Sequence, residues 1–320
     1  MDKDSAIYVS GHSGLVGSAL ERLLRREGYR RVATRPRREL DLTDRAAVER
    51  FFRRCRPRYV FHAAAEVGGI SANSSRPADF IFRNLAIQSN VIDAAHRHGV
   101  ERLIFFGSSC AYPRSARAPI REDSLLTGPI ESTSEAYAVA KIAGLKMCQA
   151  YNRQHGTDFL TVVPANLYGP GDCFGADGHV AAGLIRRFHE AKEQKAPAVS
   201  IWGSGSPRRD FLYVDDLAEA CLFLMRRPGR LPFDLVNIGS GKETSIRDLA
   251  RLAGQAAGFS GRIVFDLSRP DGAPRRFLDQ RRIASMGWRP RTALREGLRL
   301  TFAWYRRTSA SHGKDHRAGA

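Results

Sequence analysis

Short apolar runs alternate with amphipathic helical patterns through the first half of the chain. Patterns typical of buried strands occur at residues 6–10, 30–34, 59–65, 103–108 and 159–164. Between them, apolar residues recur every three to four positions, which predicts helices at 15–28, at 46–54 with Thr43 as cap, at 77–98 and at 135–155. Strands that alternate with helices in this way predict an α/β fold, with a parallel sheet covered by helices on both faces.

The alternation becomes less regular after about residue 165. Helices are predicted at 179–192, 215–227 and 245–258, and short strands at 199–202, 235–241 and 263–266. We expect a Rossmann-type, doubly wound sheet in residues 1–165, to which the chain returns around residues 206–243. Residues 166–320 should form mainly a smaller, partly discontinuous substrate lobe, with a frayed tail at about 308–320. Such a lobe would cover the carboxyl ends of the strands, where ligands bind in open α/β sheets.

Composition places the chain among globular proteins without a membrane partner. Apolar residues make up 43% and charged residues 26% of the 320, and no apolar run approaches the ~20 residues of a membrane span. The first residues lack the basic and apolar regions of a secretory signal. The five cysteines are scattered and contain no CxxC pair, which argues against a disulfide framework and against a structural zinc site. We therefore expect a cytoplasmic protein that holds no metal.

The formal net charge of +18 is unusual, because strongly basic proteins often bind nucleic acid or anionic surfaces. The basic residues, however, are spread along the whole chain. There is no basic tail and no basic strand with interleaved aromatic residues of the RNA-recognition type. We therefore expect no nucleic-acid partner. A non-catalytic dinucleotide-binding regulator or a nucleic-acid binder is the alternative from another class.

A glycine-rich turn joins the first predicted strand to the first predicted helix. It reads Gly11-His12-Ser13-Gly14-Leu15-Val16-Gly17, with GxxGxxG spacing. Glycine permits the tight turn, and the free backbone N–H groups at the start of a helix bind a pyrophosphate. In this position the motif predicts a dinucleotide cofactor.

The residues after the second predicted strand favour NADP over NAD. NAD usually requires an acidic residue there, whereas this chain reads Thr34-Arg35-Pro36-Arg37-Arg38. Arginine forms charge-assisted, bidentate hydrogen bonds and so suits a 2′-phosphate. We expect Arg35 to be the main contact, while Arg37 and Arg38 could also belong to a solvated basic loop.

Three further residues have the chemistry needed to reduce a carbonyl group. Tyr137 and Lys141 stand at i and i+4 of a helical pattern and therefore share one face. The adjacent ammonium is expected to lower the pKa of the phenol, which could then give a proton to a carbonyl oxygen as hydride arrives at the carbon. Ser108, at the end of the preceding strand, could hydrogen-bond the same oxygen.

GxxGxxG, the strand-end serine and YxxxK together resemble the extended short-chain dehydrogenase/reductase superfamily. Within it, longer segments resemble the enzymes that epimerise and reduce GDP-linked 4-keto-6-deoxy sugars; examples are AAAEVGGI, GSSCAYP, EAYAVAKIAG, NLYGP and WGSGSPRRDFLYVDD. The resemblance implies NADPH as cofactor and a GDP-sugar with a ketone at C4 as substrate. The alternative is a related GDP-sugar 4-reductase or epimerase with a different substrate or stereochemistry.

The same resemblance implies roles for individual residues. Inverting C3 and C5 beside the ketone requires a base and an acid on opposite faces of the sugar, and the matching residues are Cys110 as base and His179 as acid. Without the resemblance, Cys110 would be a buried small hydrophobe and His179 a solvent-facing residue at a helix start. The residues matched to the GDP-sugar are Arg187, Trp202, Arg209, Arg276 and Asn166. Those matched to the cofactor are Gly11, Ser13, Gly14, Leu15, Val16, Gly17, Arg35, Arg37, Ala64, Lys141, Pro164 and His179.

Members of this family pair their subunits, which bears on the assembly of this chain. The long helices predicted at 77–98 and 135–155 could join two copies in a four-helix bundle. The resemblance therefore implies a homodimer.

Overall fold

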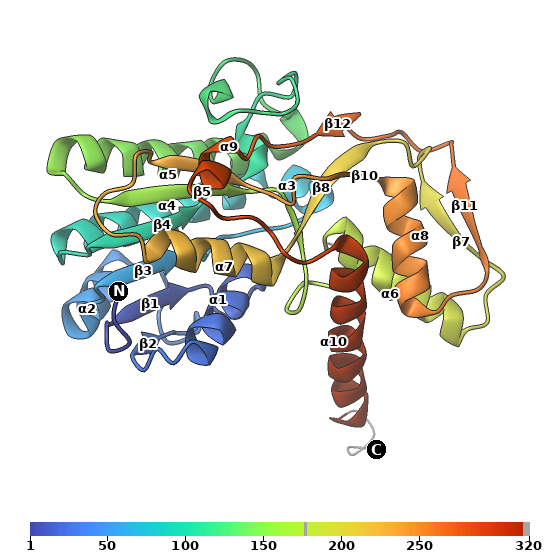
Figure 1. Ribbon diagram of the computed structural model, residues 1–320, viewed down its shortest axis with the longest axis horizontal. Helices are drawn as coiled ribbons and strands as arrows, with labels where there is room; N and C mark the ends of the chain where they lie inside the picture. The colour runs from blue at the N-terminus through green and yellow to red at the C-terminus, as the bar shows by residue number, and fades with distance from the viewer. Residues whose placement is uncertain (176–177, 316–320) are drawn as a thin grey trace.

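The computed structural model describes residues 1–175 and 178–315, and its larger part is built on a six-stranded sheet (Figure 1). All neighbouring strands are parallel, in the order β2-β1-β3-β4-β5-β9. The strands are β1 (Ile7–Ser10), β2 (Val32–Ala33), β3 (Tyr59–His62), β4 (Arg102–Phe106), β5 (Phe159–Pro164) and β9 (Leu235–Ile238). β1, β3 and β4 are buried throughout, which explains why each reads as a continuous apolar run. The predicted α/β fold with a parallel sheet is confirmed.

Successive side chains of these strands enter two separate cores, one on each face of the sheet. Ile7 and Val9 pack with helices α1 (Leu15–Arg26) and α7 (Val214–Met225). Tyr8, between them, packs with α2 (Arg45–Cys55) and α4 (Pro77–Arg97), and α5 (Glu135–His155) lies against α4. The period of two along a strand thus places helices on both faces, as expected for a doubly wound sheet.

The start of α2 differs from the prediction by one residue. Asp44, and not Thr43, caps the helix, because its carboxylate accepts a hydrogen bond from Ala47 N at 3.0 Å. Thr43 instead donates its hydroxyl to Asp41 at 2.8 Å. Both residue types are good caps, so the local pattern could not distinguish them.

The smaller part of the molecule contains two further sheets. In one, β6 (Asn166–Tyr168), β10 (Glu243–Ser245) and β12 (Arg275–Arg276) each pair with β8 (Arg208–Tyr213); in the other, β7 (Ala198–Trp202) pairs with β11 (Arg262–Asp266). Helices α6 (Val180–Glu193), α8 (Ile246–Ala257) and α10 (Leu294–Asp315) share one apolar core with these strands (Figure 1). α10 runs through the first part of the segment where fraying was predicted, and residues 316–320 lie outside the described part.

Shorter elements connect these units and were not predicted. They are α3 (Ile70–Ser75), α9 (Arg281–Ser285) and the 3₁₀ helices η1 (Ser109–Ala111), η2 (Glu122–Ser124) and η3 (Ser132–Ser134). Among the helices in residues 1–175 and 178–315, none combines the length and the apolar character needed to cross a membrane.

A buried arginine joins β4 to the end of α7. Arg102 is only 5% exposed. Its guanidinium donates hydrogen bonds to the carbonyl oxygens of Leu224, at 2.7 Å, and Arg227, at 2.9 Å. It also donates to the carboxylate of Asp158, at 2.6 Å. Leu224 lies in the last turn of α7 and Arg227 just beyond it, where carbonyl oxygens lack the regular helical donors; Leu224 O accepts one backbone hydrogen bond, from Arg227 N at 3.3 Å. The guanidinium therefore completes the helix end inside the protein.

We expect Arg102→Met to lower the free energy of unfolding by about 3 kcal/mol, because the carbonyl oxygens and Asp158 lose their donor. Urea denaturation followed by circular dichroism would measure this. Arg30→Met is the matched control, since it removes only an exposed pair with Asp4 and should cost less than about 1 kcal/mol. Equal losses in the two variants would contradict the role assigned to Arg102.

Candidate active site

The central strands of the large sheet carry several of the predicted cofactor and catalytic residues at or just after their carboxyl ends. β1 leads into Gly11, β3 into Ala64, β4 into Ser108, and β5 ends at Pro164. Parallel strands end at the same edge of a sheet, which is where open α/β sheets bind ligands. The residues that follow each strand therefore determine which ligand can bind at this edge of the sheet.

The glycine-rich turn is packed so closely that two of its glycines admit no side chain. A Cβ on Gly11 would lie 2.7 Å from Ala64 N, and one on Gly17 would lie 2.1 Å from Gly11 O. Gly14 is different, because a Cβ there would meet only Gly11 O, at 3.5 Å. Gly14 is also the N-cap of α1 and offers no side chain to the N–H groups of the first turn. This cradle of free donors at a helix N-terminus fits a pyrophosphate.

The arginines after β2 lie at the same edge and are only loosely paired. The guanidinium of Arg35 donates to Thr34 O at 2.6 Å and lies 3.9 Å from the carboxylate of Glu39. Arg37 is exposed, 3.7 Å from Asp41. Ion pairs of this length are weak, so both side chains can turn toward a phosphate. Their contact with a 2′-phosphate stays a prediction.

Three predicted catalytic residues lie close together near the end of β4. Ser108 and Cys110 follow that strand in the chain, and Tyr137 approaches them from α5. Ser108 caps η1, and its hydroxyl oxygen accepts a hydrogen bond from Cys110 N at 3.2 Å. Burial, and then the charge of Cys110, raise the pKa of Tyr137 well above its usual value, although a hydrogen bond with Ser108 acts in the opposite direction. A thiolate and a phenolate this close repel each other. The phenol of Tyr137 therefore keeps its proton in this site.

Lys141 lies beneath this group, one turn further along α5. It is 4% exposed; its ammonium donates to Phe106 O at 2.9 Å and lies 5.8 Å from the centre of the Tyr137 ring. The predicted shared face of Tyr137 and Lys141 is confirmed. The expected lowering of the Tyr137 pKa is wrong, because burial dominates both groups: it raises the pKa of the phenol and lowers that of Lys141 to about 8.

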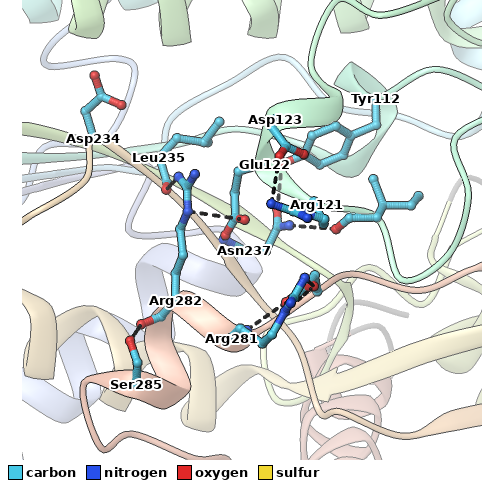
Figure 2. Close-up of polar contacts among 12 residues, drawn as sticks. Tyr112, Arg121, Glu122, Asp123, Asp234, Leu235, Asn237, Arg281, Arg282 and Ser285 are labelled. Atoms are coloured by element: carbon cyan, nitrogen blue, oxygen red, sulfur yellow. Dashed lines mark hydrogen bonds and ion pairs between the residues drawn. The ribbon is translucent and has the colours of Figure 1, made fainter.

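A buried polar network holds the chain segments around η1 and η2 (Figure 2). The Tyr112 hydroxyl donates to Asn237 Oδ1 at 2.7 Å, and Asn237 N donates to Glu122 Oε1 at 3.0 Å. Arg282 reaches the other oxygen of Glu122, at 3.4 Å. Burial raises the pKa of Glu122. These residues come from three separate parts of the chain, around residues 112–122, 237 and 282, so no local pattern in the sequence could have indicated the network.

Two of the arginines predicted to bind the substrate lie side by side next to Cys110. Arg209 of β8 and Arg276 of β12 are register partners. Arg276 donates to the carbonyl oxygens of Ser109 at 2.5 Å and Tyr112 at 3.1 Å. Burial, and then the charge of Arg276, lower the pKa of Arg209. Two neighbouring guanidinium groups without a carboxylate between them favour an anion such as a diphosphate.

The other predicted substrate residues lie on separate elements of the smaller part. Asn166 donates to Asp210 O at 3.1 Å, and Arg187 on α6 donates to Ser200 O on β7. Trp202 ends β7 and is 68% exposed. In residues 1–175 and 178–315, no hydrogen bond or ion pair joins these three to Arg209 or Arg276. Their roles stay predictions.

His179 stands immediately before α6 and is held by a carboxylate that the sequence did not single out. Its Nδ1 lies 2.7 Å from Oδ1 of Asp172, and this hydrogen bond raises the pKa of His179. The side chain of Asp172 is 1% exposed, whereas that of His179 is 59% exposed. Asp172 follows NLYGP in a loop, where an acidic residue is ordinary and carries no signal of its own.

The sheet, the glycine-rich turn and the Ser-Tyr-Lys group define a dinucleotide-dependent α/β enzyme. The NAD dependent epimerase/dehydratase family matches residues 7–239, and the chain belongs to this family. Among its relatives, GDP-L-fucose synthase 1 of Arabidopsis thaliana is 52% identical over 305 residues, which are 95% of this chain and 94% of the plant protein.

Solved structures show the same similarity. The GDP-L-fucose synthetase of Naegleria fowleri bound to NADP has a TM-score of 0.90 and 29% identity, and the match covers 97% of this chain and 95% of that one. The GDP-mannoheptose C4 reductase of Campylobacter jejuni with NADP bound has a TM-score of 0.88 and 38% identity, over 96% of this chain and 99% of that one.

Proposed function

We propose that the protein converts GDP-4-keto-6-deoxy-D-mannose to GDP-L-fucose, by inverting C3 and C5 and then reducing the C4 ketone with NADPH. One observation carries this proposal. A thiol, Cys110, lies with Ser108 and Tyr137 over the buried Lys141, in a chain that is 52% identical to a GDP-L-fucose synthase over nearly its whole length. Reduction alone requires Ser108, Tyr137 and Lys141, whereas epimerisation also requires a base, which Cys110 supplies.

In the epimerisation, the Cys110 thiolate removes a proton from C3 or C5, next to the ketone. The negative charge moves to O4, where the hydroxyls of Ser108 and Tyr137 donate hydrogen bonds to it. The His179 imidazolium then gives a proton to the same carbon from the opposite face, which inverts the centre. Each group exchanges its proton with solvent before the second centre reacts.

In the reduction, the glycine-rich turn would hold NADPH, which would supply the hydride for C4. Tyr137 gives its phenolic proton to O4 and becomes a phenolate. The Lys141 ammonium beneath the ring stabilises that phenolate. The raised pKa of Tyr137 keeps the proton available until the oxygen of the ketone becomes basic enough to accept it.

The chain should use its two parts differently in this reaction. We propose residues 1–165 as the cofactor domain, to which the chain returns around 206–243 through α7 and β9, and 166–320 as mainly the substrate lobe, which also includes β8. The scattered free cysteines support a cytoplasmic location, where thiols stay reduced.

We also propose a homodimer through α4 and α5, which expose Phe82 (69%) and Val139 (40%). Light scattering that gave only the 35.5 kDa monomer mass would refute the dimer.

We expect Gly14→Ala and Gly17→Ala to separate cofactor binding from folding. A methyl group on Gly14 clears the protein but occupies the start of α1, so the Kd for NADPH should rise about tenfold or more with an unchanged Tm. A methyl group on Gly17 collides with Gly11 O, so the Tm should fall as well. NADPH fluorescence titration and thermal unfolding would measure both. Normal NADPH binding by Gly14→Ala would mean that the pyrophosphate lies elsewhere.

The proposed reaction can be tested in one incubation. Purified protein, GDP-4-keto-6-deoxymannose and NADPH are combined in deuterated water, and NADPH absorbance and product mass are followed together. We expect NADPH oxidation and a product that carries deuterium at C3 and C5. Oxidation without deuterium would instead indicate a GDP-sugar 4-reductase, the activity named for the Campylobacter jejuni neighbour. Absence of oxidation would rule out this substrate.

A further inference from the structure

The loop between β6 and α6 contains a carboxylate whose main partner is the imidazole of His179. Oδ1 of Asp172 accepts two hydrogen bonds, from His179 Nδ1 at 2.7 Å and from Cys173 N at 2.8 Å. Its second oxygen is buried and has no partner among the described residues. A carboxylate that is 1% exposed costs free energy unless donors surround it, so its pairing with His179 is a substantial part of what keeps it there.

This loop passes directly beside the glycine-rich turn. Gly171, immediately before Asp172, has φ +91°, and a Cβ on it would lie 2.6 Å from Ser18 Oγ and 3.8 Å from Leu15 Cα. Both neighbours belong to the first turn of α1, where the pyrophosphate is proposed to bind. The carboxylate and its histidine are therefore anchored at the edge of the cofactor site and not in a remote part of the surface.

A second anchor fixes the loop from the other side. The Phe174 ring stacks on Tyr305 of α10, with centroids 4.5 Å apart, and on Trp304, with centroids 5.9 Å apart. Stacked aromatic pairs of this kind stabilise the packing of the loop against α10. Asp172 is thus held between the start of α1 and α10, so the direction of its carboxylate is set by the fold.

We propose that Asp172 is the positioning residue for His179: its carboxylate fixes the imidazole so that Nδ1–H faces the protein and Nε2 faces the substrate. A carboxylate can only accept a hydrogen bond, so the proton between the two groups resides on Nδ1. Proton transfer to the sugar must then use Nε2. This role rests on the proposed function, because it assigns His179 the proton that inverts the sugar carbons.

The same contact keeps His179 in the form that can donate a proton. The negative charge of Asp172 stabilises the imidazolium, and the hydrogen bond between the two groups raises the pKa of His179. Asp172→Asn preserves the shape of the side chain but removes the charge, and Asp172→Glu preserves the charge but lengthens the side chain. The two variants therefore distinguish the effect of the negative charge on residue 172 from the effect of the length of its side chain.

The first test needs no substrate. Protein labelled with ¹⁵N-histidine is titrated by NMR, and the His179 signal is identified by its loss in His179→Gln. We expect His179 to titrate above the ordinary value of about 6.5 in the unmodified protein and about one pH unit lower in Asp172→Asn. Asp172→Glu should recover part of the shift. Identical titration in the unmodified protein and Asp172→Asn would overturn the assignment.

The second test follows the two half-reactions separately. In Asp172→Asn, deuterium uptake at C3 and C5 should slow about 10- to 100-fold, and the high-pH limb of its pH profile should move to lower pH. Oxidation of GDP-L-fucose by NADP⁺ requires no epimerisation and should change by less than about twofold. Asp4→Asn, which removes an exposed carboxylate paired only with Arg30, should change neither rate.

These results distinguish a failure of the role assigned to Asp172 from a failure of the proposed function. Equal losses in deuterium uptake and GDP-L-fucose oxidation would make Asp172 a structural residue and overturn the proposal. If the unmodified protein turned over no substrate while the NMR titrations behaved as expected, the proposed function would be wrong but the pairing of Asp172 with His179 would stand.

Discussion

Tyr137→Phe is expected to slow NADPH oxidation about 10²- to 10⁴-fold, while deuterium uptake at C3 and C5 continues. The substitution removes only the phenolic oxygen, which is the proton donor to O4 during hydride transfer. The proton transfers at C3 and C5 use Cys110 and His179, and Ser108 still donates a hydrogen bond to O4, so exchange at these carbons should slow far less than the reduction. Stopped-flow absorbance of NADPH and mass spectrometry of the recovered substrate would measure the two steps independently.

Tyr151→Phe is the matched control for this experiment. It also removes one phenolic oxygen from α5, but that oxygen bonds to Asp93 at 2.9 Å, and the residue stands about 21 Å further along the helix. Its rate of NADPH oxidation should be unchanged within about twofold. If Tyr137→Phe reduced the ketone as fast as Tyr151→Phe, the proton would have to come from another group.

Cys110→Ser should produce the opposite pattern, with deuterium uptake slowed about 10²- to 10⁴-fold and GDP-L-fucose oxidation largely retained. A serine hydroxyl is far less acidic than a thiol, so at neutral pH it cannot serve as the base that removes the protons beside the ketone. Deuterium content of the sugar after a timed incubation without NADPH would measure the exchange directly. The initial rate of NADPH formation from GDP-L-fucose would measure the reverse of the reduction.

Cys55→Ser provides the control for the loss of a thiol. Cys55 ends α2, away from the carboxyl ends of the strands, and burial raises its pKa, so it carries no base function. Unchanged exchange in Cys55→Ser with lost exchange in Cys110→Ser would support the proposed base. Retained exchange in Cys110→Ser would show that another group removes the protons, and Cys110 would then be a small apolar residue next to Tyr137.

The close approach of Cys110 and Tyr137 explains how one site can hold a base and an acid at the same pH. Ionisation of either group disfavours ionisation of the other, because two negative charges would meet in a buried region. With the thiol ionised, the phenol stays protonated and ready for O4. Epimerisation has to precede reduction for a different reason, because the protons at C3 and C5 are acidic only while C4 is a ketone.

Local sequence patterns predicted a large part of this protein because they depend on nearest neighbours. The buried strands are continuous apolar runs, the helices have their own period, and GxxGxxG stands at a strand–helix junction where only glycine fits, as Gly11 and Gly17 show. Because parallel strands end at one edge, the positions of Gly11 and Ser108 at or directly after the ends of predicted strands also indicated that they lie at the same edge of the sheet. The spacing of Tyr137 and Lys141 predicted their shared face in the same way.

Tertiary structure decided the properties that depend on burial and on partners far apart in the chain. Burial reverses the expected pKa shift of Tyr137, and the pairing of β12 with β8 brings Arg276 to the carbonyl of Ser109. The support of His179 by Asp172 depends on the path of one loop between α1 and α10. A sequence pattern records which side chain stands at a position, whereas proton affinity and orientation depend on what the fold packs around it.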